Sequence, residues 1–306
     1  MKKGTMSKFR MAVLGDSVPW GQGLLNQHKY HTLIENELLK SYDVDKGVLA
    51  HSGATIGVGV TTWRTTDGEV PISYPTIIQQ YESYSDSPES VDLVLVNGGI
   101  NDIDIRTILN PLTDSSDLSD DIRQHCYADM LILLQLIGTK FTSANAKIVV
   151  TGYYPILSSQ SEVIRILPLL GVLGIGMPSH IYQGPLFDKI ISLSLQFWHE
   201  SDQRLADAVA GANAKLGGSR FVFVPSPLQE ANSVFGPAPW LFGIRFDLSP
   251  QDEVIELRHQ SCDAFFTNPL DIASREQCYR ASAGHPNVIG AQQIASSILK
   301  AMGITP

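Results

Sequence analysis

Five short runs of the chain are apolar at nearly every position. They cover residues 9–14, 47–51, 91–97, 147–153 and 220–224. Strands that are buried on both faces of a parallel sheet have this unbroken pattern, whereas strands with one face in water alternate apolar and polar residues. The pattern therefore predicts five strands in one parallel sheet.

Between these runs, apolar residues recur at helical spacing. The helical patterns cover residues 30–42, 120–137 and 288–302. The second begins with Asp120 and Asp121, whose charges suit the positive end of the helix dipole. Alternating strands and helices predict an α/β fold, a three-layer α/β/α sandwich around a central five-stranded parallel sheet. Ligands of such folds bind at the carboxyl ends of the strands.

One connection is too long for an ordinary link between a strand and a helix. Residues 155–205 contain an apolar stretch at 164–173 and a helical pattern at 186–198. Long insertions in compact domains are often functional. We expect a single domain over residues 1–306 with a helical insertion at about 155–205. The insertion either forms a lid or acyl-binding wall at the mouth of a site, or packs in the core as an ordinary helical pair.

Composition narrows the class of protein. The 306 residues are 43% hydrophobic with a formal net charge of −9, which suits a folded domain and disfavours nucleic acid as a partner. No apolar segment follows the basic N-terminal residues, so we expect no signal peptide in this chain, which is cytoplasmic or secreted with the signal removed. The longest apolar stretch, residues 166–177, is too short to cross a membrane. The oligomeric state is not indicated.

The three cysteines form neither a disulfide framework nor a zinc motif. There is no C-x-x-C among Cys126, Cys262 and Cys278, so a structural zinc site is not expected, although Cys262 and Cys278 could pair in an oxidising compartment. The acidic run at residues 114–121 lacks the spacing of a calcium loop, and we expect a solvated loop with a helix cap. No metal or cofactor is predicted.

Candidate chemistry follows the predicted strands. Ser17 comes after the first strand in Gly15-Asp16-Ser17, Gly53 follows the second strand, Asn101 follows the third, and His285 precedes the last helix. A serine at a strand-to-helix turn places its hydroxyl beside backbone N–H groups that can stabilise an oxyanion. An asparagine just past a strand can also stabilise an oxyanion, with the N–H₂ group of its side chain. Each residue alone is weak evidence, but their order predicts one site.

These residues resemble the four sequence blocks of the SGNH hydrolases, also called the GDSL esterase and lipase family. The matching segments are Gly15-Asp16-Ser17, Gly53, Gly99-Ile100-Asn101-Asp102 and His285-Pro286-Asn287. The resemblance implies the flavodoxin-like SGNH hydrolase fold and cofactor-free hydrolysis of carboxylic esters, lipid esters included. It also implies that Ser17 is the nucleophile and His285 the general base. The N–H groups of Ser17 and Gly53 and the side chain of Asn101 would form the oxyanion hole.

The chain departs from this family in one position. The family usually has an aspartate three residues before the histidine, and here Ser282 stands there. Such a carboxylate orients the imidazole and stabilises its charged form. The backbone carbonyl of Ser282 could take its place and leave a Ser–His dyad, in which case Ser282→Ala is expected to be nearly silent. Alternatively, Asp271 or Glu276 could reach His285.

Two other functions fit the same residues. One is removal of acetyl groups from a carbohydrate, which predicts a shallow polar site. The other is a catalytically silent ligand-binding module, suggested by the absent aspartate. A further open point concerns the aromatic residues between 235 and 246, which either line an acyl pocket or pack a long loop: Phe235, Trp240, Phe242 and Phe246.

Overall fold

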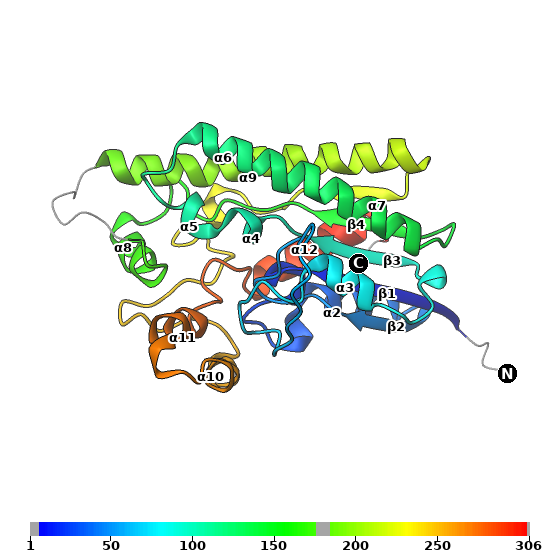
Figure 1. The fold of residues 1–306 in the computed structure, drawn as a ribbon, viewed down its shortest axis with the longest axis horizontal. Coiled ribbons are helices and arrows are strands. Elements are labelled where there is room, and N and C mark those ends of the chain that lie inside the picture. The colour runs from blue at the N-terminus through cyan, green and yellow to red at the C-terminus, as the bar shows by residue number, and fades with distance from the viewer. Residues whose placement is uncertain (1–5, 176–183, 305–306) are drawn as a thin grey trace.

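The computed structural model describes residues 6–175 and 184–304. Its centre is the predicted five-stranded parallel sheet, with strand order β2-β1-β3-β4-β5 (Figure 1). The strands are β1 (Ser7–Gly15), β2 (Tyr42–Val48), β3 (Leu93–Asn97), β4 (Lys147–Thr151) and β5 (Phe221–Val224). Helices cover both faces, so the predicted three-layer α/β/α sandwich is confirmed. The carboxyl ends of all five strands meet at one edge, as parallel strands must.

Helices from both halves of the chain form the outer layers. α2 packs against α12 on one face of the sheet, while α3, α7 and α9 lie together on the other (Figure 1). The helices are α1 (Ser17–Trp20), α2 (Tyr30–Leu38), α3 (Ile77–Ser83), α4 (Ile100–Ile103), α5 (Ile105–Ile108), α6 (Ser115–Ile122), α7 (Met130–Lys140), α8 (Val163–Val172), α9 (Gly184–Leu216), α10 (Ile255–Phe265), α11 (Ile272–Tyr279) and α12 (Val288–Ala301). Short 3₁₀ turns occupy Asn26–His28, Pro88–Ser90, Glu230–Asn232 and Pro269–Asp271.

The prediction for the second strand was wrong in position. β2 begins at Tyr42, five residues before the predicted run at 47–51, and α2 ends at Leu38 rather than at residue 42. β2 lies at the edge of the sheet, paired with β1 alone, and its side chains are half-buried or exposed. An edge strand carries polar residues such as Asp43 and Asp45, so it lacks the apolar run that marks a central strand.

The acidic run at 114–121 is mostly helical. α6 begins at Ser115, and the Asp114 side chain caps it by accepting a hydrogen bond from the Ser116 N–H at 2.7 Å. A π-helical segment, Arg123–Asp129, joins α6 to α7. The predicted helix at 120–137 therefore starts too late, because the cap lies at Asp114 and not at Asp120.

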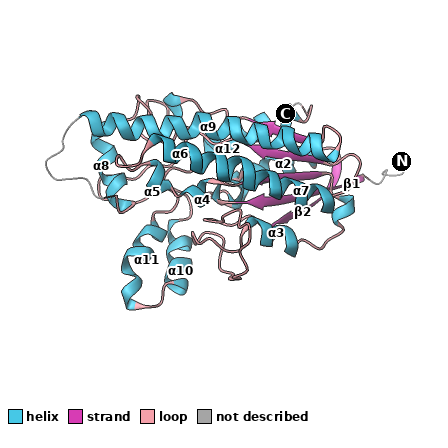
Figure 2. Cartoon of the chain, turned by 45° about the horizontal axis from the view of Figure 1, so that its top comes forward, coloured by secondary structure: helices cyan, strands magenta, loops and turns pink. Residues whose placement is uncertain are grey.

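The predicted insertion consists of two different parts. α8 stands apart at the end of the molecule that carries the carboxyl ends of the strands, whereas α9 continues to Leu216 and packs along α6 and α7 (Figure 2). Residues 176–183 of the predicted insertion lie outside the described residues. The second half of the predicted insertion is thus the start of the helix that leads to β5.

A helical hairpin of α10 and α11 covers the same end of the molecule (Figure 1). A disulfide joins Cys262 on α10 to Cys278 on α11, with 6.0 Å between the two Cα atoms. Both sulfurs are buried with Val70 in a small apolar cluster separate from the main core. Among the described helices, none combines the length and the apolar character needed to cross a lipid bilayer.

Candidate active site

Ser17 lies at the turn between β1 and α1. Gly15 has a φ of +131°, and a Cβ added there would come within 2.5 Å of the Asn97 carbonyl oxygen, so only glycine fits this turn. The Asp16 side chain then caps α1 by accepting a hydrogen bond from the Val18 N–H at 2.8 Å. Ser17 is therefore the first residue of a short helix at the carboxyl end of a central strand.

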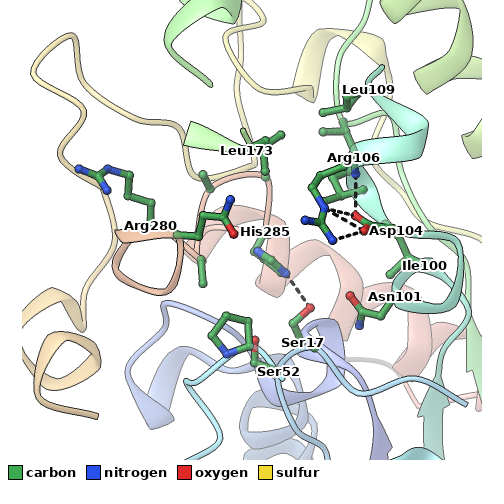
Figure 3. Close-up of a pocket in the computed structure, with 18 of the residues that line it drawn as sticks. Ser17, Ser52, Ile100, Asn101, Asp104, Arg106, Leu109, Leu173, Arg280 and His285 are labelled. Carbon is green, nitrogen blue, oxygen red and sulfur yellow. Dashed lines mark hydrogen bonds and ion pairs between the residues drawn. The ribbon is translucent and has the colours of Figure 1, made fainter. Parts of the chain in front are cut away.

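His285 reaches this serine from the other end of the chain. Its Nε2 lies 2.7 Å from the Ser17 Oγ, although the residues are 268 positions apart (Figure 3). In the neutral imidazole that carries its proton on Nδ1, Nε2 can accept the hydroxyl proton. This is the contact that a general base needs in order to activate a serine nucleophile.

The turn that holds His285 is fixed by backbone bonds. The Phe242 N–H donates to the His285 carbonyl oxygen at 2.7 Å, and the Gly284 N–H donates to the Phe242 carbonyl oxygen at 2.8 Å. On the C-terminal side, Asn287 caps α12 by accepting hydrogen bonds from the N–H groups of Ile289 and Gly290. These contacts place His285 just before a helix start, as the sequence predicts.

The structure brings Gly53 to the same cavity as Ser17. Gly53 has a φ of +79°, and a Cβ added to it would meet the Ile72 backbone nitrogen at 2.6 Å. The close approach of this second chain segment explains why glycine is needed. Its N–H as an oxyanion donor stays a prediction, which its place in the cavity wall supports.

Asn101 and Asp102 hold the Gly53 loop in place. The Asn101 Nδ2 donates to the Ala54 carbonyl oxygen at 3.0 Å, and the Ile56 N–H donates to both Asp102 carboxylate oxygens at 3.1 and 3.0 Å. The side-chain amide has a second hydrogen left for a ligand. Asn101 lies beside Ser17 in the cavity wall (Figure 3).

A residue that the sequence analysis did not single out connects two of these segments. The Tyr153 hydroxyl donates to the Asp16 Oδ2 at 2.8 Å and accepts a hydrogen bond from the Ile100 N–H at 3.1 Å. Tyr153 follows β4 and is almost fully buried. No motif marks this tyrosine, and its position at the end of the predicted strand 147–153 was the one available signal.

Burial sets the electrostatics of the site. Burial raises the pKa of Asp16 to about 6, although the hydrogen bonds from Val18 and Tyr153 lower it in part. Burial likewise raises the pKa of Asp102 to about 6. For His285, burial lowers the pKa to about 4, the nearby backbone of Ser282 opposes this shift, and the Arg258 charge adds to it. The imidazole is therefore neutral at pH 7, the state required of a base.

None of the three candidate orienting groups donates to or accepts from the Nδ1 of His285. That atom is buried and has no hydrogen-bond partner among the described residues. The Ser282 hydroxyl donates to Asp252 instead, and the Glu276 carboxylate accepts from the Arg280 Nη1 at 2.5 Å. Asp271 lies in a 3₁₀ turn at the start of α11. The carbonyl oxygen of Ser282 accepts from the His285 backbone N–H at 3.0 Å, so it lies in the same turn as the imidazole.

Ser17, Gly53, Asn101 and His285 line one cavity of about 360 Å³. One side is apolar and includes three residues of the predicted insertion: Ile156, Leu169 on α8 and Leu173 directly after that helix. Other apolar lining residues include Ile72, Ile100, Ile105, Leu109 and Tyr154. The polar lining side chains include Ser52, Asp104, Arg106 and Arg280, which are labelled in Figure 3, and also Ser73 and Gln277.

The aromatic residues at 235–246 do not line this cavity. Phe235 and Phe242 are buried in the main core, Trp240 packs against that core, and Phe246 is 71% exposed. Core packing of a long loop is therefore the correct interpretation for three of them.

One group of side chains in the described residues has the composition of a metal site. Ligand atoms of Asp102, His125 and Asp129 lie within 4.8 Å of one another. Each already has a protein partner, because the His125 Nδ1 is 2.7 Å from the Asp129 Oδ2 and Asp102 accepts from Ile56. Of the three, Asp102 binds the loop that carries Gly53, and His125 and Asp129 bind each other.

No family model matches the sequence, and no curated protein matches it. Among solved structures, a carbohydrate esterase family 2 enzyme with its carbohydrate-binding domain, from Corynascus thermopiles (Myceliophthora fergusii), is 17% identical, with 99% of this chain and 69% of that chain covered and a TM-score of 0.46. A lipase from a goat rumen metagenome is 12% identical, with coverages of 96% and 97% and a TM-score of 0.47. An acetyl xylan esterase from Geobacillus stearothermophilus is 13% identical, with coverages of 99% and 98% and a TM-score of 0.45.

Proposed function

We propose that this chain is a serine hydrolase of carboxylic esters, with Ser17 as nucleophile and His285 as general base. The observation that carries the proposal is the 2.7 Å contact between the Ser17 Oγ and the His285 Nε2 in the wall of a ligand-sized cavity. Gly53 and Asn101 line the same cavity, which supports their role as hydrogen-bond donors to the negative charge that develops on an ester oxygen. Four residues from four distant segments thus supply the groups for acyl transfer.

The reaction proceeds through an acyl-enzyme. His285 takes the proton of Ser17 as the serine oxygen attacks the ester carbonyl, and the N–H groups of Ser17 and Gly53 with the Asn101 amide stabilise the oxyanion. The imidazolium then donates its proton to the leaving alcohol. A water molecule, activated by His285 in the same way, hydrolyses the acyl-enzyme and restores the free serine.

The preferred substrates are esters of medium-length acyl chains. Leu109, Ile156, Leu169 and Leu173 give one side of the cavity an apolar surface that an acetyl group would leave largely uncovered. Each methylene buried there contributes about 0.8 kcal/mol to binding. We assign part of the wall of this acyl site to α8, through Leu169.

The experiment is hydrolysis of p-nitrophenyl esters from acetate to palmitate, with Ser17→Ala as the control variant. Turnover by the wild type and its loss in the variant would support the proposal. If the cavity holds an apolar acyl chain, the fastest hydrolysis should occur with esters whose acyl chain is longer than acetyl. An optimum at acetate would favour carbohydrate deacetylation.

A fluorophosphonate probe tests the nucleophile without any assumption about the ester. The wild type should be labelled on Ser17, and Ser17→Ala should not. A protein that neither hydrolyses any ester nor reacts with the probe would be a ligand-binding module, and the proposal would be rejected.

A further inference from the structure

Behind His285, buried charged side chains join segments that are far apart in the sequence. Arg258 on α10 and Asp252 before it have fully buried side chains. The Arg258 guanidinium donates to both oxygens of Asp252, at 2.5 Å from Nη2 and 3.1 Å from Nη1. The hydroxyl of Ser282 donates to the Asp252 Oδ2, so this carboxylate is bound from two sides. Ser282 is itself fully buried, three residues before His285.

The same arginine faces the segment that carries the nucleophile. Its Nη1 lies 3.5 Å from the Glu69 Oε2, and Glu69 is only 3% exposed. Glu69 in turn accepts hydrogen bonds from the Trp20 Nε1 at 2.9 Å and the Gln22 Nε2 at 3.0 Å. These two residues follow Ser17 within α1 and the turn after it. The buried ions therefore connect the turn of Ser17 with the turn of His285.

The position of the imidazole requires such a support. The Nδ1 of His285 is buried without a hydrogen-bond partner among the residues that the structure describes. A histidine base in a serine hydrolase depends on a group that holds the Nδ1 side of its ring. The backbone of residues 281–283 lies near the imidazole and favours its charged form, which raises the pKa of His285 against the larger lowering caused by burial.

We propose that Asp252 and Ser282 are positioning residues for His285. Asp252, held by Arg258, fixes the Ser282 side chain, and this fixes the backbone of the turn against the Nδ1 of His285. Hydrogen bonds to ionised groups are strong and directional, so they define the turn more closely than apolar packing would. A carboxylate in a different segment thereby orients the base indirectly, through one hydroxyl group.

This inference rests on the proposed function, because positioning is defined by its effect on turnover. It also changes the expectation for Ser282→Ala. From the sequence alone the hydroxyl has no partner, and its removal is expected to be nearly silent. With Asp252 as its partner, we expect kcat to fall about 10-fold or more while KM stays within about twofold, because substrate binding does not involve Ser282.

The experiment compares Ser282→Ala with Ser201→Ala. Ser201 is a fully buried serine on α9 whose hydroxyl bonds to the Trp198 carbonyl oxygen and which does not line the cavity, so it controls for the loss of a buried hydroxyl. Ser201→Ala should keep the kcat of the wild type. In Ser282→Ala, the acid limb of the kcat/KM profile should also move to lower pH, because the imidazolium loses support on its Nδ1 side.

A second test removes the Asp252 carboxylate and then restores a carboxylate at position 282. Asp252→Asn leaves the buried Arg258 short of a partner and is expected to lose both activity and stability. The double variant Asp252→Ser/Ser282→Asp keeps the charge count and moves the carboxylate next to the imidazole. We expect it to recover most of the kcat lost in Asp252→Asn and to move the acid limb to higher pH, an effect that a purely structural role would not produce.

The inference is overturned if Ser282→Ala matches Ser201→Ala in kcat and in pH profile. It is also overturned if the loss of activity in Ser282→Ala equals the loss of folded protein measured by thermal melting. If the wild type neither hydrolyses esters nor labels at Ser17, the proposed function fails and the inference fails with it. An active wild type with a silent Ser282→Ala rejects the inference alone.

Discussion

Ser17 and His285 meet at one hydrogen bond, but the structure holds the two residues in different ways. Ser17 follows β1, a central strand whose residues Met11, Ala12, Val13 and Leu14 are fully buried in the main core. His285 lies in a turn fixed by single backbone bonds, a helix cap, buried ions and a disulfide-linked hairpin. The strand that carries the nucleophile is thus held by non-directional apolar burial, with polar contacts added at its turn, whereas the turn of the base rests mainly on polar and covalent contacts whose geometry matters. The predictions below test this difference.

The largest effect is expected from removing the two residues themselves. Ser17→Ala and His285→Ala should each lower kcat by about 10³- to 10⁶-fold, and the double variant should be no slower than either single variant, because the pair acts as one unit. Steady-state kinetics on a p-nitrophenyl ester, with thermal melts for folding, gives the measurement. Multiplicative losses in the double variant would show that the two side chains act independently.

On the side of Ser17, shortening a buried side chain in the sheet should lower stability but leave the catalytic rate of the folded protein unchanged. Leu95→Ala in β3, at a fully buried position, should lower the free energy of unfolding by about 2–5 kcal/mol through lost burial and a residual cavity. The kcat per folded molecule should remain that of the wild type. Denaturant unfolding and active-site titration measure the two quantities, and a fall in kcat per titrated site would contradict the expectation.

On the side of His285, loss of the disulfide should affect both stability and activity. Cys262→Ala/Cys278→Ala opens a link of 16 residues and should lower stability by about 2–4 kcal/mol. Because Arg258 belongs to α10, we expect kcat per folded molecule to fall as well, unlike in Leu95→Ala. Unchanged kcat in the folded protein would mean that the hairpin is only a structural cover.

The pH profile should distinguish His285 from the carboxylates around it. With the pKa of His285 lowered by burial to about 4, kcat/KM should stay level from pH 7 to about pH 5 and then fall tenfold per pH unit below about pH 4, as the base becomes protonated. Asp16 and Asp102, whose pKa values burial raises to about 6, are the alternative titrating groups. An acid limb near pH 6 that moves in Asp102→Asn would assign the titration to the loop that carries Gly53.

The smallest effect concerns the apolar wall. Leu169→Ala should lower kcat/KM for octanoate esters by about 5- to 30-fold, from the 1–2 kcal/mol lost with the contact area, and should leave acetate esters nearly unchanged. Leu170→Ala, at a fully buried leucine on the same helix that does not line the cavity, is the matched control. Equal losses on acetate and octanoate would indicate general damage to the site rather than loss of an acyl contact.

Sequence patterns predicted those parts of the molecule that local physics defines. β1, β3 and β4 lie close to their apolar runs, because these interior strands are buried over most of their length. β5 also lies in its apolar run, although it is an edge strand whose two middle residues are only half-buried. β2 was misplaced because an edge strand keeps polar residues. The roles assigned to Ser17, Gly53, Asn101 and His285 stay predictions, but all four residues line the cavity where the strand ends place them.

The supporting residues could not be predicted in the same way. Tyr153, Asp252 and Arg258 show no motif or periodicity, and their roles arise only from contacts across the fold. A buried arginine is identical in sequence to a solvated one, since burial is a property of the assembled structure. The sequence therefore locates the reacting groups more readily than the contacts that orient them.

The 268 positions between Ser17 and His285 also bear on how the protein is made. A growing chain can form the β1–β3 pairing long before residues 240–302 have been synthesised, and contacts of such high sequence separation are slow to close. The reactive serine then exists for a time beside an open cavity with no base to activate it. Hydrolytic activity becomes a late signal of correct assembly, which appears only after the sheet and most helices are already in place.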